Sequence, residues 1–300
     1  MGELFARVNG GIDLCYETFG DPDGRPLLMI MGLGGPGLWW DDELCGMLAD
    51  RGFYAIRFDN RDCGRSTHMT GAARPRIYRA FVGATGSASY TLSDMAADAA
   101  GLLDHLSIPA AHVMGASMGG MIAQTLAIEH PDRVLSLTSI MSTTGARLVG
   151  YARPRLLPLL ARPMPRSRDA YVEETLRMWP LISSPGFPFD EDRIRRRSEA
   201  TFDRGVDRVG TARQLVAIAA SGNRTARLRR LNVPTLVIHG ANDPLINVSG
   251  GLATAKAVPN AERLIIKGMG HDMPRELWPT LVDGVDRTAK RAEARQPVTA

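Results

Sequence analysis

The sequence predicts an α/β fold: a mostly parallel sheet of eight strands, flanked by helices and interrupted by a helical insert. Short apolar runs alternate along the chain with stretches of helical periodicity, which is typical of a parallel sheet covered on both faces. Runs such as PLLMIMG (26–32) and TLVIHG (235–240) are continuously apolar, as expected of strands buried on both sides. With 300 residues, of which 44% are hydrophobic, the chain can form one globular domain with an inserted subdomain.

The individual elements are predicted from these runs and from the turn residues between them. Residues 3–8 and 12–19 are expected to form a hairpin, because Asn9-Gly10-Gly11 between them is a strong turn signal. Further strands are expected at 26–32, 54–59, 111–116, 134–141, 235–240 and 262–268. Helices are expected at 41–50, 93–107, 118–129 and 274–294, the second of them with Ser93 as its N-cap.

The insert is predicted at residues 146–230, between two core strands, as a helical cap. The core is then formed by residues 1–145 and 231–300. The insert holds 18 arginines and 9 acidic residues, a charge of about +9, while the rest of the chain sums to about −5. Attraction to an anionic membrane surface or to acidic substrates is one interpretation of this charge, and a solvated arginine-rich face is the other.

Composition excludes several function classes. No apolar run approaches the ~18 residues needed to span a bilayer, and the N-terminus has no signal-peptide core. Cys15, Cys45 and Cys63 are odd in number and widely spaced, which favours reduced thiols and a cytoplasmic location over disulfides or a zinc site. No cofactor or metal is expected, because the chain has neither a dinucleotide fingerprint nor a ligand cluster. Nucleic-acid binding is not expected either, since the positive charge lacks interleaved aromatic residues.

The segment HVMGASMGGMIAQ (112–124) places a serine between two glycines, after a strand and before a helix. G-x-S-x-G is a short pattern and is informative only in that context. On a tight strand-to-helix turn, Ser117 would adopt a strained backbone conformation, and glycine at 115 and 119 would avoid clashes with the neighbouring elements. The turn would expose the Ser117 hydroxyl at the carboxyl edge of the sheet, as a nucleophile requires.

A serine nucleophile needs a base, and the base needs an acid to orient it. Asp243 follows the strand TLVIHG, and His271 follows the last strand, ERLIIKG. Because the carboxyl ends of parallel strands meet at one edge, these two side chains are expected beside Ser117. We therefore predict Ser117 as nucleophile, His271 as base and Asp243 as acid, in preference to the neighbouring Asp272.

Stabilisation of an oxyanion requires two hydrogen-bond donors near the nucleophile. The backbone N–H of Met118, directly after the serine, is one candidate. The second is expected from the glycine-rich turn MIMGLGGPG after the third strand, where the backbone N–H of Leu33 is chosen by position.

Four motifs together resemble the α/β-hydrolase superfamily: GASMGG, FDNRDCGRST (58–67), VPTLVIHGANDPL (233–245) and GMGHDMP (268–274). More narrowly, they are similar to actinobacterial esterases of the aclacinomycin methylesterase type and to mycobacterial lipase- or esterase-like relatives. The resemblance implies a Ser-His-Asp hydrolase of carboxylic esters, with a lid over its pocket. Many relatives have His-Gly before the oxyanion residue and His before the nucleophile, whereas this chain has Met31-Gly32 and Ala116.

Arg61 and Asp62 match a family turn motif and are expected to brace the active-site loops, by an ion pair or turn hydrogen bonds. In the insert, an apolar pocket could be roofed by the side chains of Met178, Trp179, Phe187 and Phe189, although these could equally form the core of the lid. Of Trp39 and Trp40, one is expected to line the pocket and the other to pack.

The sequence thus predicts a serine esterase acting on a small, apolar ester. A carbon–carbon bond hydrolase or a cofactor-free perhydrolase would keep the same three residues and change only the pocket. A non-catalytic ligand binder that has kept the fold is the alternative from a different class.

Overall fold

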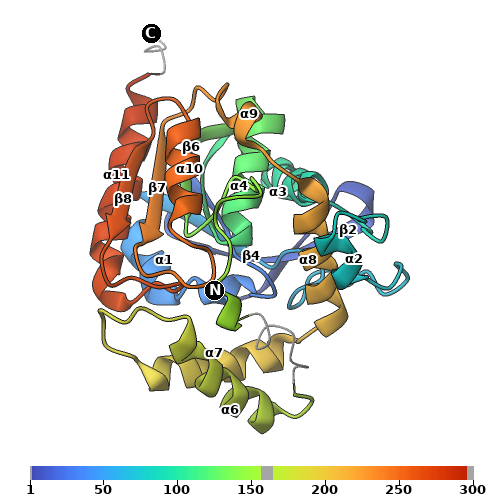
Figure 1. The fold of residues 1–300 in the computed structure, drawn as a ribbon. Coiled ribbons are helices and arrows are strands. Elements are labelled where there is room, and N and C mark those ends of the chain that lie inside the picture. The colour runs from blue at the N-terminus through green and yellow to red at the C-terminus, as the bar shows by residue number, and fades with distance from the viewer. Residues whose placement is uncertain (1, 157–164, 296–300) are drawn as a thin grey trace.

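The computed structural model describes residues 2–156 and 165–295, which form one sheet of eight strands covered by helices (Figure 1). The spatial order of the strands is β1-β2-β4-β3-β5-β6-β7-β8. β2 pairs antiparallel with both β1 and β4, and every other neighbouring pair is parallel. The predicted fold class, a mostly parallel eight-stranded sheet, is confirmed.

The strands lie close to their predicted positions. They are β1 (Leu4–Val8), β2 (Ile12–Phe19), β3 (Arg25–Ile30), β4 (Phe53–Phe58), β5 (Ala111–Ala116), β6 (Val134–Ile140), β7 (Thr235–Gly240) and β8 (Glu262–Ile266). The hairpin turn contains Gly10 and Gly11, both with positive φ (65° and 80°), which glycine adopts at little cost. β3 and β8 end two residues earlier than expected, because glycine-containing turns follow both strands.

The helices of the core are α1 (Asp42–Ala49), α2 (Ile77–Phe81), α3 (Leu92–His105), α4 (Met118–Glu129), α10 (Ser249–Ala257) and α11 (Trp278–Glu293). The expected N-cap at Ser93 is wrong. Thr91 is the N-cap and forms a reciprocal capping box with Asp94, so the helix begins before Ser93. The sequence analysis did not identify α2 and α10.

Two hydrophobic clusters lie on opposite faces of the sheet, and β3 contributes alternate residues to each. Leu28 and Ile30 pack with α3 and α4, whereas Leu27 and Met29 pack with α1 and α11. This period of two is the geometry of a strand buried on both faces. The sheet is therefore held between two helical layers, and its carboxyl edge is left for loops.

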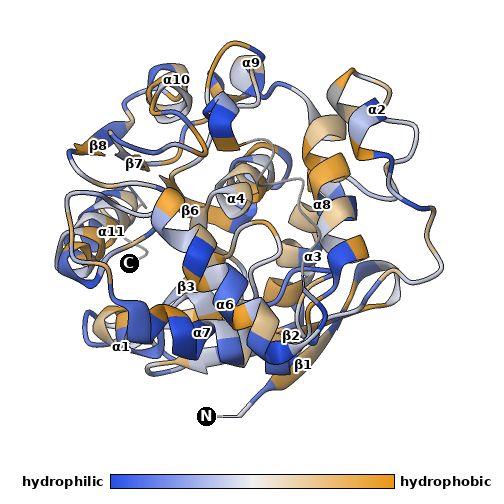
Figure 2. Ribbon diagram, turned by 60° about the horizontal axis from the view of Figure 1, so that its bottom comes forward, coloured by the Kyte–Doolittle hydropathy of each residue, from blue (hydrophilic) through white to orange (hydrophobic). Residues whose placement is uncertain are grey.

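The segment between β6 and β7 contains α6 (Arg168–Met178), α7 (Glu191–Arg204), α8 (Arg208–Ser221) and α9 (Thr225–Leu228). α6 and α7 pack on each other and lie below the core in Figure 1, whereas α8 packs against α2 and α3. α7 is mostly hydrophilic in Figure 2, and Ile194 is its one buried hydrophobic residue. Within residues 2–156 and 165–295, no helix combines the length and apolar character needed to cross a membrane.

Candidate active site

Ser117 lies at the turn between β5 and α4, in the backbone conformation that a nucleophile turn requires. Its φ and ψ are 56° and −119°, a region that residues with a side chain seldom occupy and that costs about 1–3 kcal/mol. The turn is held by the Ser117 N–H, which donates to the Ile140 carbonyl at 2.9 Å. The Ser142 hydroxyl donates to the Ser117 carbonyl at 2.8 Å.

The two glycines of the motif are required by close backbone contacts. A Cβ at Gly119 would lie 2.0 Å from the Ile30 carbonyl oxygen, and a Cβ at Gly115 would lie 2.1 Å from the Gly119 carbonyl oxygen. Both distances are far inside van der Waals contact. Backbone atoms cannot move aside as a flexible side chain can, so no other residue fits this turn without shifting the strand or the helix.

The loop after β8 brings His271 to the serine. Its Nε2 lies 3.0 Å from Ser117 Oγ, and its Nδ1 lies 2.7 Å from Asp243 Oδ2. The His271 backbone N–H donates to the Ile182 carbonyl at 2.7 Å, so the segment of the insert between α6 and α7 fixes the loop. A continuous hydrogen-bonded chain therefore runs from the hydroxyl through the imidazole to the carboxylate.

Asp243 lies directly after β7 and is buried. Its Oδ1 accepts the backbone N–H groups of Leu245 and Ile246, each at 2.8 Å. Its Oδ2 is left for His271. A carboxylate fixed on one oxygen by two backbone donors holds a single orientation, which selects the tautomer of the imidazole that faces it.

The glycine-rich turn after β3 approaches the serine closely: a Cβ at Gly32 would lie 3.1 Å from Ser117 Cβ. Three contacts fix this turn. Asn60 Nδ2 donates to the Met31 carbonyl (2.9 Å), Gly34 N–H donates to Gln214 Oε1 (2.8 Å), and Gly37 N–H donates to Asp59 Oδ1 (2.7 Å). Among the described residues, the backbone N–H groups of Leu33 and Met118 donate to no other group.

The expected bracing by Arg61 and Asp62 takes a particular form, because the two residues do not pair with each other. Arg61 binds Asp98 of α3 (2.6 and 2.7 Å), whereas both oxygens of Asp62 accept from Arg213 of α8 (2.7 and 2.8 Å). Burial alone would raise the pKa of Asp62, but hydrogen bonds from Arg213, the Met69 N–H and Tyr90 hold it below its usual value.

The neighbouring turn residue Asp59 also binds the insert. Arg204 of α7 donates to Asp59 Oδ2 at 2.7 Å, and Gln214 of α8 donates to the Arg61 carbonyl at 2.8 Å. Sequence analysis missed Arg204, Arg213 and Gln214 as contacts of the active-site loops. Their partners lie about 145–180 positions away in the chain, so no local pattern could reveal them.

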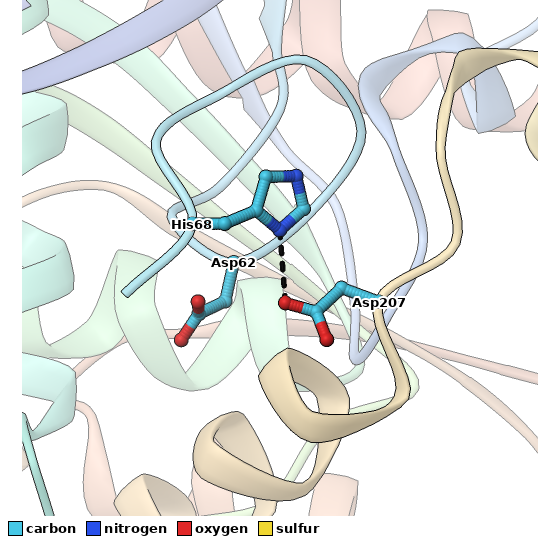
Figure 3. A group of neighbouring side chains, drawn as sticks. All are labelled: Asp62, His68 and Asp207. Carbon is cyan, nitrogen blue, oxygen red and sulfur yellow. Dashed lines mark hydrogen bonds and ion pairs between the residues drawn. The ribbon is translucent and has the colours of Figure 1, made fainter. Parts of the chain in front are cut away.

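Asp62, His68 and Asp207 lie close enough together to hold a metal ion (Figure 3). Their partners argue against that role, because the Arg213 guanidinium contacts both carboxylates and already supplies a counter-charge there. His68 Nδ1 lies 2.9 Å from Asp207 and its Nε2 lies 2.9 Å from the Gly64 carbonyl. Burial lowers the pKa of His68, but these two acceptors outweigh it and raise the pKa. The group is an ion-pair cluster that joins the turn to α8.

The aromatic residues expected around a pocket divide between two environments. Trp40 is fully buried in the core, whereas Trp39 donates from Nε1 to Thr201 of α7 at 2.9 Å. Trp179 meets Trp39 edge to face at 5.3 Å, and the Arg197 guanidinium lies over both rings. Trp39 and Trp179 therefore join the turn after β3 to the insert.

Beside His271 lies a cavity of about 250 Å³, lined by Phe189, Arg193 and Asp272 among others. Burial raises the pKa of Asp272, which accepts a hydrogen bond from Ser184. The lining mixes polar and apolar side chains, so Phe189 shares the cavity with charged residues. Phe187 packs on the hydrophobic cluster beneath the sheet instead.

All three cysteines are free and buried. Burial raises the pKa of Cys15 and Cys45 to about 12, and that of Cys63 well above its usual value. Thiols with such pKa values stay protonated, and none of the three is a nucleophile candidate.

This chain is similar to several known proteins and to one family model. The family model of the alpha/beta hydrolase fold matches residues 25–274. Two curated relatives are rhodomycin D methylesterases. The one from Streptomyces peucetius is 29% identical, over 89% of this chain and 91% of its own, and the one from Streptomyces sp. strain C5 is 31% identical, over 88% and 90%.

Solved structures agree in fold. The enol-lactonase from Burkholderia xenovorans LB400 superposes with a TM-score of 0.75 at 22% identity, covering 96% of this chain and all of the other. The esterase RhEst1 from Rhodococcus sp. ECU1013 gives a TM-score of 0.72 at 19% identity, covering 97% and 99%. This chain belongs to the alpha/beta hydrolase fold family.

Proposed function

We propose that the protein is a serine hydrolase that cleaves carboxylic esters through an acyl-enzyme. The observation that carries this proposal is the chain of hydrogen bonds from Ser117 through His271 to Asp243, at 3.0 and 2.7 Å. The methylesterase names of the two Streptomyces relatives favour esters over other acyl compounds.

In the first step, Ser117 Oγ attacks the ester carbonyl carbon while His271 Nε2 takes the hydroxyl proton. The oxyanion accepts hydrogen bonds from the backbone N–H groups of Met118 and Leu33. The carbon–oxygen bond of the ester then breaks, and His271 returns the proton to the departing alcohol. Water attacks the acyl-enzyme by the same route, releasing the acid and restoring the serine. These steps require no cofactor or metal.

The proposal includes a lid over this site, formed by residues 146–230, of which residues 157–164 lie outside the described part of the chain. Three contacts support this proposal, because each joins the insert to a loop at the carboxyl edge. Ile182 binds the His271 loop, Arg193 binds Asp41, and Thr201 binds Trp39. Substrate choice would then depend on the insert. An apolar ester remains our prediction for the substrate, and a cytoplasmic location remains a prediction as well.

Part of the positive charge behind the membrane hypothesis is offset by carboxylates of the core. Several arginines of the insert bind carboxylates of the core: Arg193 binds Asp41, Arg204 binds Asp59, and Arg213 binds Asp62. Paired arginines leave less charge to attract anionic lipid. Co-sedimentation with anionic vesicles at low and high salt tests what remains, and we expect no binding.

The function is tested by labelling with an alkyl fluorophosphonate, followed by mass mapping of the adduct. We expect one adduct on Ser117, hydrolysis of an activated ester, and loss of both in the folded Ser117→Ala variant. Ser136→Ala is the matched control, because this buried serine of β6 binds His112 and lies away from the turn. Turnover retained by Ser117→Ala would disprove the assignment.

The alternatives give different results in the same experiment. An adduct on Ser117 without turnover across an ester panel would favour the carbon–carbon hydrolase or the perhydrolase. Absence of any adduct on folded protein would favour the ligand binder.

A further inference from the structure

A second histidine, His239, lies behind the acid of the proposed triad. It is near the end of β7, four residues before Asp243, and its side chain is fully buried. His239 Nε2 lies 2.8 Å from the Ile246 carbonyl oxygen and 3.5 Å from Asp243 Oδ2. Both neighbours are acceptors, so Nε2 carries the proton of the imidazole.

His239 contacts the loop that surrounds the Asp243 carboxylate. The Ile246 residue is held twice: its carbonyl accepts from His239, and its N–H donates to Asp243 Oδ1 at 2.8 Å. The loop that wraps the carboxylate is therefore anchored to β7 through the imidazole. The same Nε2 lies 3.5 Å from Asp243 Oδ2, the oxygen that binds His271.

The imidazole is suited to stay neutral. Burial lowers its pKa, although the Ile246 carbonyl and Asp243 act in the opposite direction, and His271 adds to the lowering. Nδ1 is buried and has no hydrogen-bond partner among the described residues. On that side the ring meets α10, where a Cβ at Gly251 would lie 2.4 Å from Nδ1. α10 thus packs directly against the Nδ1 side of the ring.

We propose that His239 is a positioning residue, which holds the loop of residues 243–246 and thereby orients the Asp243 carboxylate toward His271. This inference rests on the proposed function, because the orientation matters only if His271 acts as a base. The alternative is a histidine that only fills the core.

His112 provides a matched comparison for that alternative. It is also buried on a central strand, β5, and burial lowers its pKa to about 4. Its Nδ1 lies 2.9 Å from Ser136 Oγ, and no contact joins it to Ser117, Asp243 or His271 within the described ranges. Loss of either imidazole should lower stability, but only loss of His239 should alter the chemistry.

The experiment compares His239→Leu, His239→Gln and His112→Leu by steady-state kinetics over a range of pH, with thermal unfolding of each. For His239→Leu we expect kcat to fall about 10- to 100-fold with little change in KM. This is the size of effect expected when a hydrogen bond near a charged group is lost. The acidic limb of kcat/KM should move to lower pH, because the imidazolium formed on His271 loses support. His239→Gln keeps an N–H donor and should recover most of the rate.

Gly251→Ala tests the same idea without changing the histidine, and it decides the matter if His239→Leu does not fold. The added methyl group should displace the ring and lower kcat in the same way. Gly46→Ala is its control, because a Cβ there meets nothing within 4 Å and the substitution should leave kcat unchanged.

The outcomes separate the two levels of inference. If the wild type is labelled at Ser117 but folded His239→Leu and Gly251→Ala keep its kcat and pH profile, His239 is a core residue and this proposal is wrong. If the wild type is not labelled at all, the proposed function fails first and the positioning role fails with it.

Discussion

The turn that carries Ser117, between β5 and α4, and the contacts between the insert and the core are stabilised by different forces. Around Ser117, backbone atoms approach so closely that glycine alone fits, as the 2.0 and 2.1 Å approaches at Gly119 and Gly115 show. The insert is attached instead by buried ion pairs, Arg204–Asp59 and Arg213–Asp62 among them. One region is shaped by steric exclusion and the other by charge.

This difference predicts how the two regions should respond to amino-acid substitution. Steric packing between strand and helix does not depend on pH and tolerates no added atom. A buried ion pair depends on both of its partners, because removal of one leaves an uncompensated charge in the interior. Addition of a single methyl group should therefore disrupt the turn, whereas removal of a single charge should disrupt the contacts of the insert.

The largest effect is expected from Gly119→Ala. The methyl group would overlap the Ile30 carbonyl and force β3 and α4 apart, at a cost of more than about 5 kcal/mol of folding stability. Urea unfolding measures the loss of folding stability, and ester turnover measures the effect on the Ser117 site. Gly46→Ala should instead be neutral or slightly stabilising, and a fully stable, active Gly119→Ala would break the steric account of the turn.

A somewhat smaller effect is expected from Arg213→Met. Asp62 would remain buried without its counter-charge, and stability should fall by about 3–5 kcal/mol. The double variant Asp62→Asn with Arg213→Met should recover part of the loss, because it removes the orphaned charge. Equal stability of the single and double variants would show that the pair does not act through charge. As a surface control, Arg168→Gln breaks only exposed ion pairs, with Asp203 and Glu199, and should leave stability unchanged.

The smallest effect is a pH dependence at the His68 cluster. The pKa of His68 is raised in the folded state, so its contribution is fully present below about pH 6.5 and is lost as the pH rises through that raised pKa. Thermal unfolding of the wild type and His68→Gln should therefore differ most at about pH 6, by about 1 kcal/mol. The difference should shrink toward about pH 9. A difference that grows with pH would mean that His68 is neutral in its two hydrogen bonds.

Much of the fold follows from local patterns. Apolar runs locate the six strands from β3 to β8, and the Asn9-Gly10-Gly11 turn locates β1 and β2. The central strands are apolar along their length because they are buried on both faces, and the Gly-x-Ser-x-Gly segment locates the Ser117 turn. The order of Ser117, Asp243 and His271 after three parallel strands predicts their meeting at one edge. Their role in catalysis stays a proposal, but the structure brings them within hydrogen-bond reach of one another.

Other features were out of reach of such patterns. The short helix α2 has too few residues for a periodic signal. The predicted N-cap, Ser93, is wrong because a cap is decided by which side chain reaches the N3 amide, and that side chain is Thr91. Arg204, Arg213 and Gln214 look like ordinary polar residues of a basic insert. Only the folded chain shows that they bind Asp59, Asp62 and the Gly34 amide.

The sequence by itself determined where backbone and burial leave no choice: the buried strands, the glycines of the nucleophile turn, and the loops after β5, β7 and β8. Only the tertiary structure decided which carboxylates bind which arginines, and that His239 lies behind Asp243. Steric rules act over a few neighbouring residues and leave a local signature. Ion pairs and hydrogen bonds join residues more than a hundred positions apart, so their partners are fixed by the fold.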